Sequence, residues 1–214
     1  MKNKLLVLLA LTVLSASFVP ARAADISTFS FNSGMNCRGV WRLPDTGQAA
    51  CYNTAGPIGC PAAGAALAQD GTYAPAVTQP AYAILNHVGI SSVTLDNVSG
   101  LMWITNPRTD AAMGGLYTWT AAVEACETKA SYAGFSDWRL PNVRELMSIV
   151  DYGKDPGPAL NTAAFPAARN SAYWSSTTYM QNATLAWRVN FLDGGVNVDL
   201  KTLGSYVRCV RGGL

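Results

Sequence analysis

The sequence almost lacks histidine, since His87 is the only one in 214 residues. Histidine is the commonest side chain for proton transfer near neutral pH and a frequent metal ligand. Its scarcity excludes most hydrolase triads and histidine metal sites. We therefore predict no catalytic residue, no bound metal and no cofactor.

The chain also lacks an excess of one charge. Three of its 15 basic residues lie within residues 1–23, which leaves 12 basic against 13 acidic residues. This balance gives no electrostatic reason to expect nucleic acid as a partner. After residue 23, no segment has the about 20 apolar residues of a membrane-spanning helix. We therefore expect no transmembrane segment in the mature protein.

Residues 1–23 have the pattern of a secretory signal peptide. Lys2 and Lys4 precede an apolar stretch, and Ala21-Arg22-Ala23 supplies a small-x-small cleavage motif. A membrane anchor is the alternative, but the stretch is short and polar residues interrupt it. We expect cleavage before Ala24 and export to the periplasm, the cell envelope or the medium.

Export makes the five cysteines disulfide candidates. They are Cys37, Cys51, Cys60, Cys126 and Cys209. An odd number allows at most two bridges within one chain. Glycines and a proline between Cys51 and Cys60 let that loop turn back, so this pair is favoured. The state of Cys37 stays open.

The chain divides into two regions after the signal peptide. Residues 24–90 are rich in Gly, Ala and Pro, which predicts a loop-rich segment that contains the Cys51–Cys60 loop. Residues 91–214 show regular patterns, beginning with strands around Val93–Leu95 and Leu101–Ile104. We predict that they form an α+β domain.

Two helices are predicted in the second region. Thr118 caps the first, whose apolar stripe is Trp119, Ala122, Val123, Cys126 and Ala130. Asn142 and Glu145 have the spacing of a capping box for the second. Leu146, Ile149 and Val150 form its buried face, and the helix ends between residues 153 and 158.

The C-terminal part is predicted to be a β-hairpin followed by a last strand. A two-residue turn at Asp193-Gly194 places Arg188 opposite Asp199 on the polar face. The last strand, Tyr206–Val210, carries Cys209. Because Cys126 faces the core from a helix, a Cys126–Cys209 bridge would join distant parts of the domain.

The aromatic residues suggest both a core and a binding surface. Trp103, Trp138, Trp174 and Trp187 occupy strand or motif positions and are predicted to be core. Polar and aromatic side chains on the outer face of the hairpin are the candidate ligand-binding residues. They are Tyr179, Met180, Asn182, Arg188, Asn197, Asp199 and Lys201.

Several motifs occur in an order that resembles a known bacterial family. They are Leu43–Gln48 with Cys51-Tyr52 and Cys60-Pro61, Gly100–Trp103, Ala133–Asn142 with Glu145-Leu146, Tyr173–Thr177, and Tyr206–Arg211. Together they resemble the family typified by the C-terminal domain of the Legionella collagen-like adhesin. The resemblance implies a C-type-lectin-like fold, similar also to the formylglycine-generating enzyme.

The resemblance implies an exported, non-catalytic adhesion module that binds a glycan, a polyanion or an envelope or surface protein. Calcium-dependent sugar binding is not expected, because the Glu-Pro-Asn and Trp-Asn-Asp motifs of C-type lectins are absent. An oxidase of the formylglycine-generating type and a structural envelope component are the alternatives. The ligand and the oligomeric state stay open.

Overall fold

A computed structural model describes residues 44–73, 81–86, 92–129 and 131–212. The predicted signal peptide, Cys37, His87 and Ala130 lie outside these residues. No helix among the described residues has the length and apolar character needed to cross a membrane. The described part contains short helices and short antiparallel strands, which confirms the predicted α+β class.

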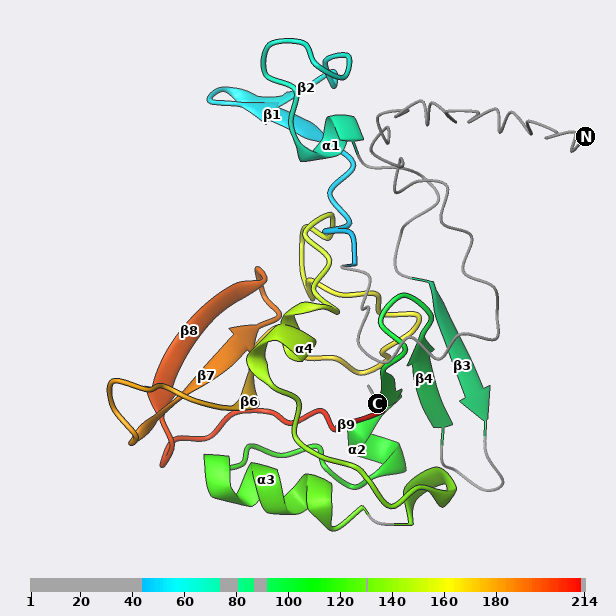
Figure 1. Ribbon diagram of the computed structural model, residues 1–214, viewed down its shortest axis with the longest axis vertical. Coiled ribbons are helices and arrows are strands. Elements are labelled where there is room, and N and C mark those ends of the chain that lie inside the picture. Colours follow the sequence, from blue (N-terminus) through cyan, green and yellow to red (C-terminus); the bar gives the residue numbers. More distant parts are fainter. Residues whose placement is uncertain (1–43, 74–80, 87–91, 130, 213–214) are drawn as a thin grey trace, which may run out of the picture. The chain divides into compact units, whose positions relative to one another are not determined.

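The elements follow one another as shown in Figure 1. The helices are α1 (Asp70–Tyr73), α2 (Pro107–Asp110), α3 (Trp119–Glu127) and α4 (Val143–Met147), with a 3-10 turn at Tyr132–Gly134. The strands are β1 (Cys51–Asn53), β2 (Gly56–Ile58), β3 (Tyr82–Asn86), β4 (Ser92–Asp96), β5 (Met102–Ile104), β6 (Ala172–Thr178), β7 (Leu185–Asn190), β8 (Gly195–Leu200) and β9 (Val210–Arg211).

The strands form three antiparallel sheets. β1 and β2 make a small hairpin, closed by the confirmed Cys51–Cys60 bridge. A second sheet has the order β3-β4-β5-β9, and a third has the order β6-β7-β8. The second sheet includes β3, which precedes the predicted domain boundary at residue 91.

Both predicted helices form, and α4 begins as its sequence indicates. The Asn142 side chain accepts a hydrogen bond from the Glu145 amide at 2.9 Å, and the Glu145 carboxylate accepts one from the Asn142 amide at 2.8 Å. This is the predicted capping box. The helix ends at Met147, earlier than predicted, although Ile149 and Val150 beyond it are buried.

The β6-β7-β8 sheet has buried residues on both faces. Tyr173 and Trp174 are neighbours in β6, so their side chains leave the sheet in opposite directions. Trp174 packs in one buried cluster, which contains Cys126 of α3. Tyr173 packs in the other cluster, which contains Leu146 of α4. Helices therefore cover both faces of this sheet, whereas the sequence pattern predicted one polar face.

The Cys126–Cys209 bridge is present and joins α3 to the segment before β9. Both cysteines are fully buried, and the burial of Cys126 was predicted from the apolar stripe of α3. The predicted last strand is shorter than expected, because β9 comprises only Val210–Arg211. Before it, Tyr206 makes a single parallel bridge with Tyr173. The Cys126–Cys209 disulfide therefore anchors an extended segment that crosses between the two larger sheets.

Three of the four tryptophans predicted as core are buried: Trp103, Trp138 and Trp174. Trp187 is only partly buried, which corrects its assignment. Its ring packs edge-on against Tyr179, with 5.6 Å between centroids, near the surface of the third sheet.

The β7-β8 hairpin differs from its predicted register by two residues. Arg188 lies opposite Asn197, and the turn comprises four residues, Phe191–Gly194, rather than two. Phe191 is fully buried and leaves the ladder to join the core. The Asn190 side chain accepts a hydrogen bond from the Leu192 amide at 3.0 Å, which supports the wider turn. A shift of two keeps each side chain on its predicted face.

Candidate functional site

Two surfaces of the described chain carry enough polar side chains to be considered for ligand binding. The first is the predicted hairpin surface, on β7, β8 and the adjacent connections. Its members are Tyr179, Met180, Asn182, Arg188, Asn197, Asp199 and Lys201. The second is a pocket to which α2, the connection before β6, β6 itself and the segment before β9 contribute.

Three members of the hairpin surface bind one another. The Arg188 Nε atom donates a hydrogen bond to Asn197 Oδ1 at 2.7 Å. Its Nη2 atom forms an ion pair with Asp199 Oδ2 at 2.6 Å. The predicted ion pair is therefore confirmed, although it runs diagonally across the ladder. The polar groups of these three side chains are therefore largely used in contacts with one another.

The other members of the hairpin surface, apart from Met180, also contact neighbouring residues. Lys201 donates a hydrogen bond to Thr178 Oγ1 at 2.8 Å, and its Nζ atom lies 4.0 Å from the Trp119 ring centroid. The Asn182 side chain accepts hydrogen bonds from Thr184, and the Tyr179 hydroxyl donates to Gln181. Met180 is 93% exposed.

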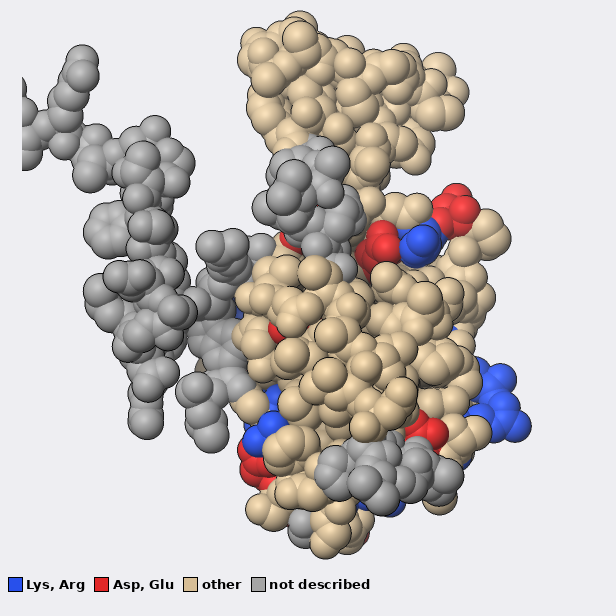
Figure 2. Space-filling model, turned by 90° about the vertical axis from the view of Figure 1, so that its right-hand side faces the viewer, with Lys and Arg blue, Asp and Glu red and all other residues tan. Residues whose placement is uncertain are grey.

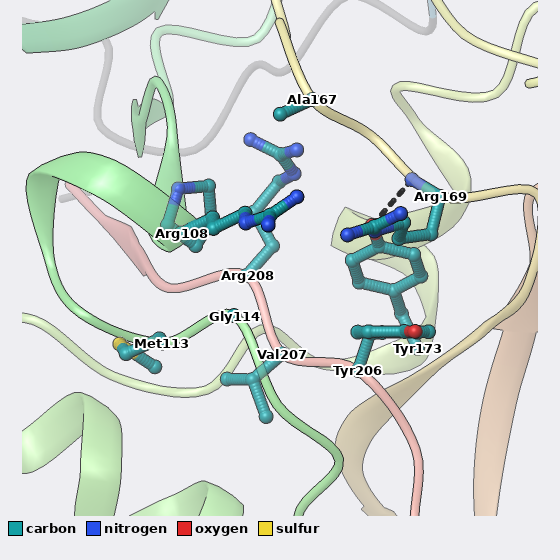
Figure 3. Close-up of a pocket in the computed structure, with 10 residues that line it drawn as sticks. Arg108, Met113, Gly114, Ala167, Arg169, Tyr173, Tyr206, Val207 and Arg208 are labelled. Carbon is teal, nitrogen blue, oxygen red and sulfur yellow. Dashed lines mark hydrogen bonds between the residues drawn. The ribbon is translucent and has the colours of Figure 1, made fainter.

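The pocket, here called the arginine pocket, is defined by six of its lining residues. These are Arg108, Gly114, Arg169, Tyr173, Tyr206 and Arg208. Figure 3 shows the two tyrosines and Arg169 on one side of it and Arg108 and Arg208 on the other. The cavity volume is about 20 Å³. It therefore admits one or two water molecules, or the tip of one ligand group.

Arg208 is the buried member of the arginine pocket, with 1% of its surface exposed. Its Nη1 atom donates hydrogen bonds to the carbonyl oxygens of Ile104 and Thr105 at 2.9 and 3.0 Å. Its Nε atom is buried and has no hydrogen-bond partner. Burial lowers the pKa of the guanidinium from its ordinary value, but arginine stays protonated in proteins. Arg208 thus holds a fixed positive charge at the pocket.

Arg108 and Arg169 are the exposed arginines of the pocket. Arg108 lies in α2, where Asn106 accepts hydrogen bonds from the first backbone amides as the N-cap. A Cβ atom on Gly114 would lie 2.7 Å from Arg108 Cγ, so glycine leaves room for the arginine to cross. The Arg169 amide donates a hydrogen bond to the Tyr173 hydroxyl at 2.9 Å, which fixes the connection that carries Arg169.

The tyrosines form an aromatic wall. The ring centroids of Tyr173 and Tyr206 lie 5.5 Å apart, and Tyr173 also packs edge-on against Phe191 at 5.1 Å. The backbone of Tyr206 is fixed by two hydrogen bonds, to Ala172 and from Trp174. Tyr173 is buried and Tyr206 is partly exposed, so Tyr206 is the ring that a ligand can reach.

The pocket gathers arginines that have no acidic partner in the described part of the chain. Among the described residues, three arginines form ion pairs: Arg139 with Glu145, Arg188 with Asp199, and Arg211 with Asp137. The four other described arginines, Arg108, Arg144, Arg169 and Arg208, form none within 4.0 Å. Three of these four line the arginine pocket. On the face drawn in Figure 2, charged side chains are few and scattered among uncharged ones.

No group of three or more His, Cys, Asp or Glu side chains within the described ranges converges so that it could hold a metal ion. The pocket itself offers guanidinium and phenol groups, which are donors suited to anions and unsuited to cations. These side chains can therefore donate hydrogen bonds to a negatively charged group.

The comparison with protein families assigns the chain. The model of the family described as the Lcl C-terminal domain matches residues 92–211. The chain belongs to the Lcl C-terminal domain family. All six residues that define the arginine pocket lie within the matched segment, as does the hairpin surface. Membership of this family supports an adhesin-like module. The search of curated proteins found no match.

The sequence did not predict the arginine pocket because its members come from three short segments, 108–114, 169–173 and 206–208. One local signal was present. Arg208 lies between Val207 and Cys209 in a segment that is otherwise apolar, and such a position predicts a buried charge. A buried charge needs partners, so this position indicates an acidic or anionic neighbour.

Proposed function

We propose that this protein is an exported, non-catalytic binding module of the adhesin type that recognises an acidic ligand. A polyanionic glycan is the first candidate, and an acidic envelope or surface protein is the second. Membership of the Lcl C-terminal domain family supports the adhesin-type role. Two disulfides support export, because such bridges persist in oxidising compartments.

The observation that carries the proposal is the meeting of three arginines, which have no acidic partner among the described residues, beside two tyrosines. Charge-assisted hydrogen bonds from arginine to carboxylate or sulfate groups are strong and directional. Aromatic rings next to them suit the apolar faces of sugar rings. The C-type-lectin-like fold that the resemblance implies is part of this proposal, since many binding domains have that architecture.

The non-catalytic part of the proposal separates it from the oxidase alternative. An oxidase of the formylglycine-generating type needs reactive thiols, and reactive thiols are exposed. Cys126 and Cys209 are buried and bonded to each other, which supports a structural role. Titration of native exported protein with a thiol reagent should then find at most one thiol per chain, that of Cys37. Three reactive thiols would favour the oxidase.

Binding to immobilised polysaccharides tests the proposal. We expect the exported chain to bind a sulfated or carboxylated polysaccharide more tightly than a neutral one, and to bind less at high salt, because salt screens charge. The variant Arg108→Ala/Arg169→Ala should lose most of this binding.

Arg144→Ala is the control for the loss of one charge outside the pocket, because Arg144 is exposed, has no ion pair among the described residues and is not a pocket residue. It should bind like the wild type. Equal binding to acidic and neutral polysaccharides would contradict the proposed function. If Arg144→Ala lost about half as much binding free energy as the double variant, in proportion to the charges removed, only net charge would matter and the pocket would then not be the site.

A further inference from the structure

The arginine pocket contains a positive charge that cannot move. Arg208 is held by hydrogen bonds to two backbone carbonyls, and its guanidinium carbon lies 4.8 Å from the Phe165 ring centroid. These contacts satisfy Nη1 and one face of the group, but they supply no negative charge. The described residues leave Arg208 without a carboxylate within 4.0 Å. A negative group at the pocket would compensate this charge.

Direct contacts to such a group would come from the exposed arginines. Arg108 reaches the pocket from α2, and Arg169 reaches it from the connection before β6. Each carries a planar guanidinium, which donates paired hydrogen bonds to the oxygens of one oxyanion. The pocket therefore has two movable donors at its opening and one fixed charge behind them.

The size of the cavity limits what can enter. A volume of about 20 Å³ is close to the space that one ordered water molecule needs. It suits the oxygens of one anionic group, and any neighbouring charged units of a polymer would lie outside it. The partly exposed ring of Tyr206 lies at the same pocket and suits the sugar ring that carries this group.

We propose that the arginine pocket binds a single oxyanion group, a carboxylate or a sulfate ester, on one sugar ring that packs against Tyr206. This inference rests on the proposed function and adds that the site recognises an individual acidic sugar rather than a run of charges. A monosaccharide with one acidic group is then a sufficient ligand.

Calorimetric titration of the exported full chain with four probes tests the inference. The probes are glucuronate, glucose 6-sulfate, glucose and a long sulfated polysaccharide. We expect glucuronate, glucose 6-sulfate or both to bind, at least tenfold more tightly than glucose, because the charged hydrogen bonds are absent from glucose. The better of the two acidic probes identifies the group as carboxylate or sulfate.

Variants connect this binding to the pocket. Arg108→Ala/Arg169→Ala should weaken binding of the acidic monosaccharide at least tenfold, whereas Arg144→Ala should change it less than twofold. Tyr206→Ala should weaken binding of the acidic sugar but not of plain acetate or sulfate, which have no ring to pack. The Arg208 Nε–H resonance, followed by nuclear magnetic resonance, should shift when the acidic sugar is added.

The outcomes separate this inference from the proposed function. Binding of the polysaccharide without binding of either acidic monosaccharide would overturn the single-group inference and leave the proposed function standing. Failure of every acidic probe would overturn both. Equal binding of glucose and glucuronate, or undiminished binding in Arg108→Ala/Arg169→Ala, would also overturn the inference.

Discussion

The hairpin surface and the arginine pocket are both rich in polar side chains, but they use them differently. On the hairpin surface, Arg188 binds Asn197 and Asp199 of the neighbouring strand. At the pocket, the arginines have no acidic partner among the described residues. Side chains that bind one another have fewer free hydrogen-bonding groups for a ligand. A charge without a partner, by contrast, attracts a ligand of the opposite charge. Polar composition alone is therefore a poor guide to a binding site.

The same contrast occurs within one segment of chain. Arg211 forms an ion pair with Asp137 at 2.7 Å and lies 3.8 Å from the Phe135 ring centroid. Arg208, three residues earlier, is buried and has no carboxylate partner among the described residues. Sequence proximity thus does not determine whether an arginine is a structural ion-pair partner or an available charge.

The largest expected effect tests what holds the pocket segment in place. Cys126→Ser/Cys209→Ser should lower the free energy of unfolding by roughly 4–5 kcal/mol in the chain-entropy description, because the bridge closes a loop of 83 residues. Cys51→Ser/Cys60→Ser, with a separation of 9, should lower it by roughly 2–3 kcal/mol. Denaturant unfolding measures both. A larger loss for the shorter loop would contradict this account.

The next effect concerns the buried arginine itself. Arg208→Ala should lower the free energy of unfolding by about 3 kcal/mol or more, because two buried carbonyls lose their donor and a cavity forms. Urea unfolding measures the change, and Arg108→Ala is the control, with an expected loss below about 0.5 kcal/mol. If Arg208→Ala were as stable as the wild type, the free-energy cost of burying the charge would equal the stabilisation that its hydrogen bonds provide.

How much of this structure the sequence predicts depends on how far apart in the sequence the interacting residues lie. The capping box of α4 involves residues three apart, and its sequence spacing identifies it. The two cysteines of the Cys126–Cys209 bridge are distant in sequence, but the pairing was predicted from the helical stripe that contains Cys126 and the predicted last strand that carries Cys209. The arginine pocket depends on tertiary placement of residues 108, 169 and 208, which no local period encodes.

A smaller effect is expected on the hairpin surface. Arg188→Ala and Asp199→Ala should each lower the free energy of unfolding by less than about 1 kcal/mol, because the pair is partly exposed. The double variant should lose less than the sum, since each change removes the same interaction. Neither should weaken binding of acidic ligands. Weakened binding in Arg188→Ala would return the hairpin surface to the list of sites.

The hairpin also shows why a register can be missed while its faces are predicted correctly. Asp193-Gly194 indicates a two-residue turn, but Phe191 is drawn into the core and widens the turn to four residues. The Asp193 side chain accepts a hydrogen bond from the Gly195 amide at 2.9 Å, which completes it. Burial of one aromatic ring outweighed the local turn preference.

The smallest expected effect tests the paired arginine of the pocket segment. The Arg211 guanidinium, through its hydrogen bond, holds the pKa of Asp137 below its ordinary value. A carboxylate with a lowered folded pKa stabilises the fold above its unfolded pKa, near 4, and this contribution is lost as the pH falls through the folded pKa. Because the Asp137 side chain is 42% exposed, the contribution should be below about 1 kcal/mol. Asp137→Asn should therefore lose slightly less stability than the wild type as the pH falls below about 4. Parallel unfolding curves across this range would mean that the pair contributes nothing, and Arg211 would then resemble Arg208 as an available charge.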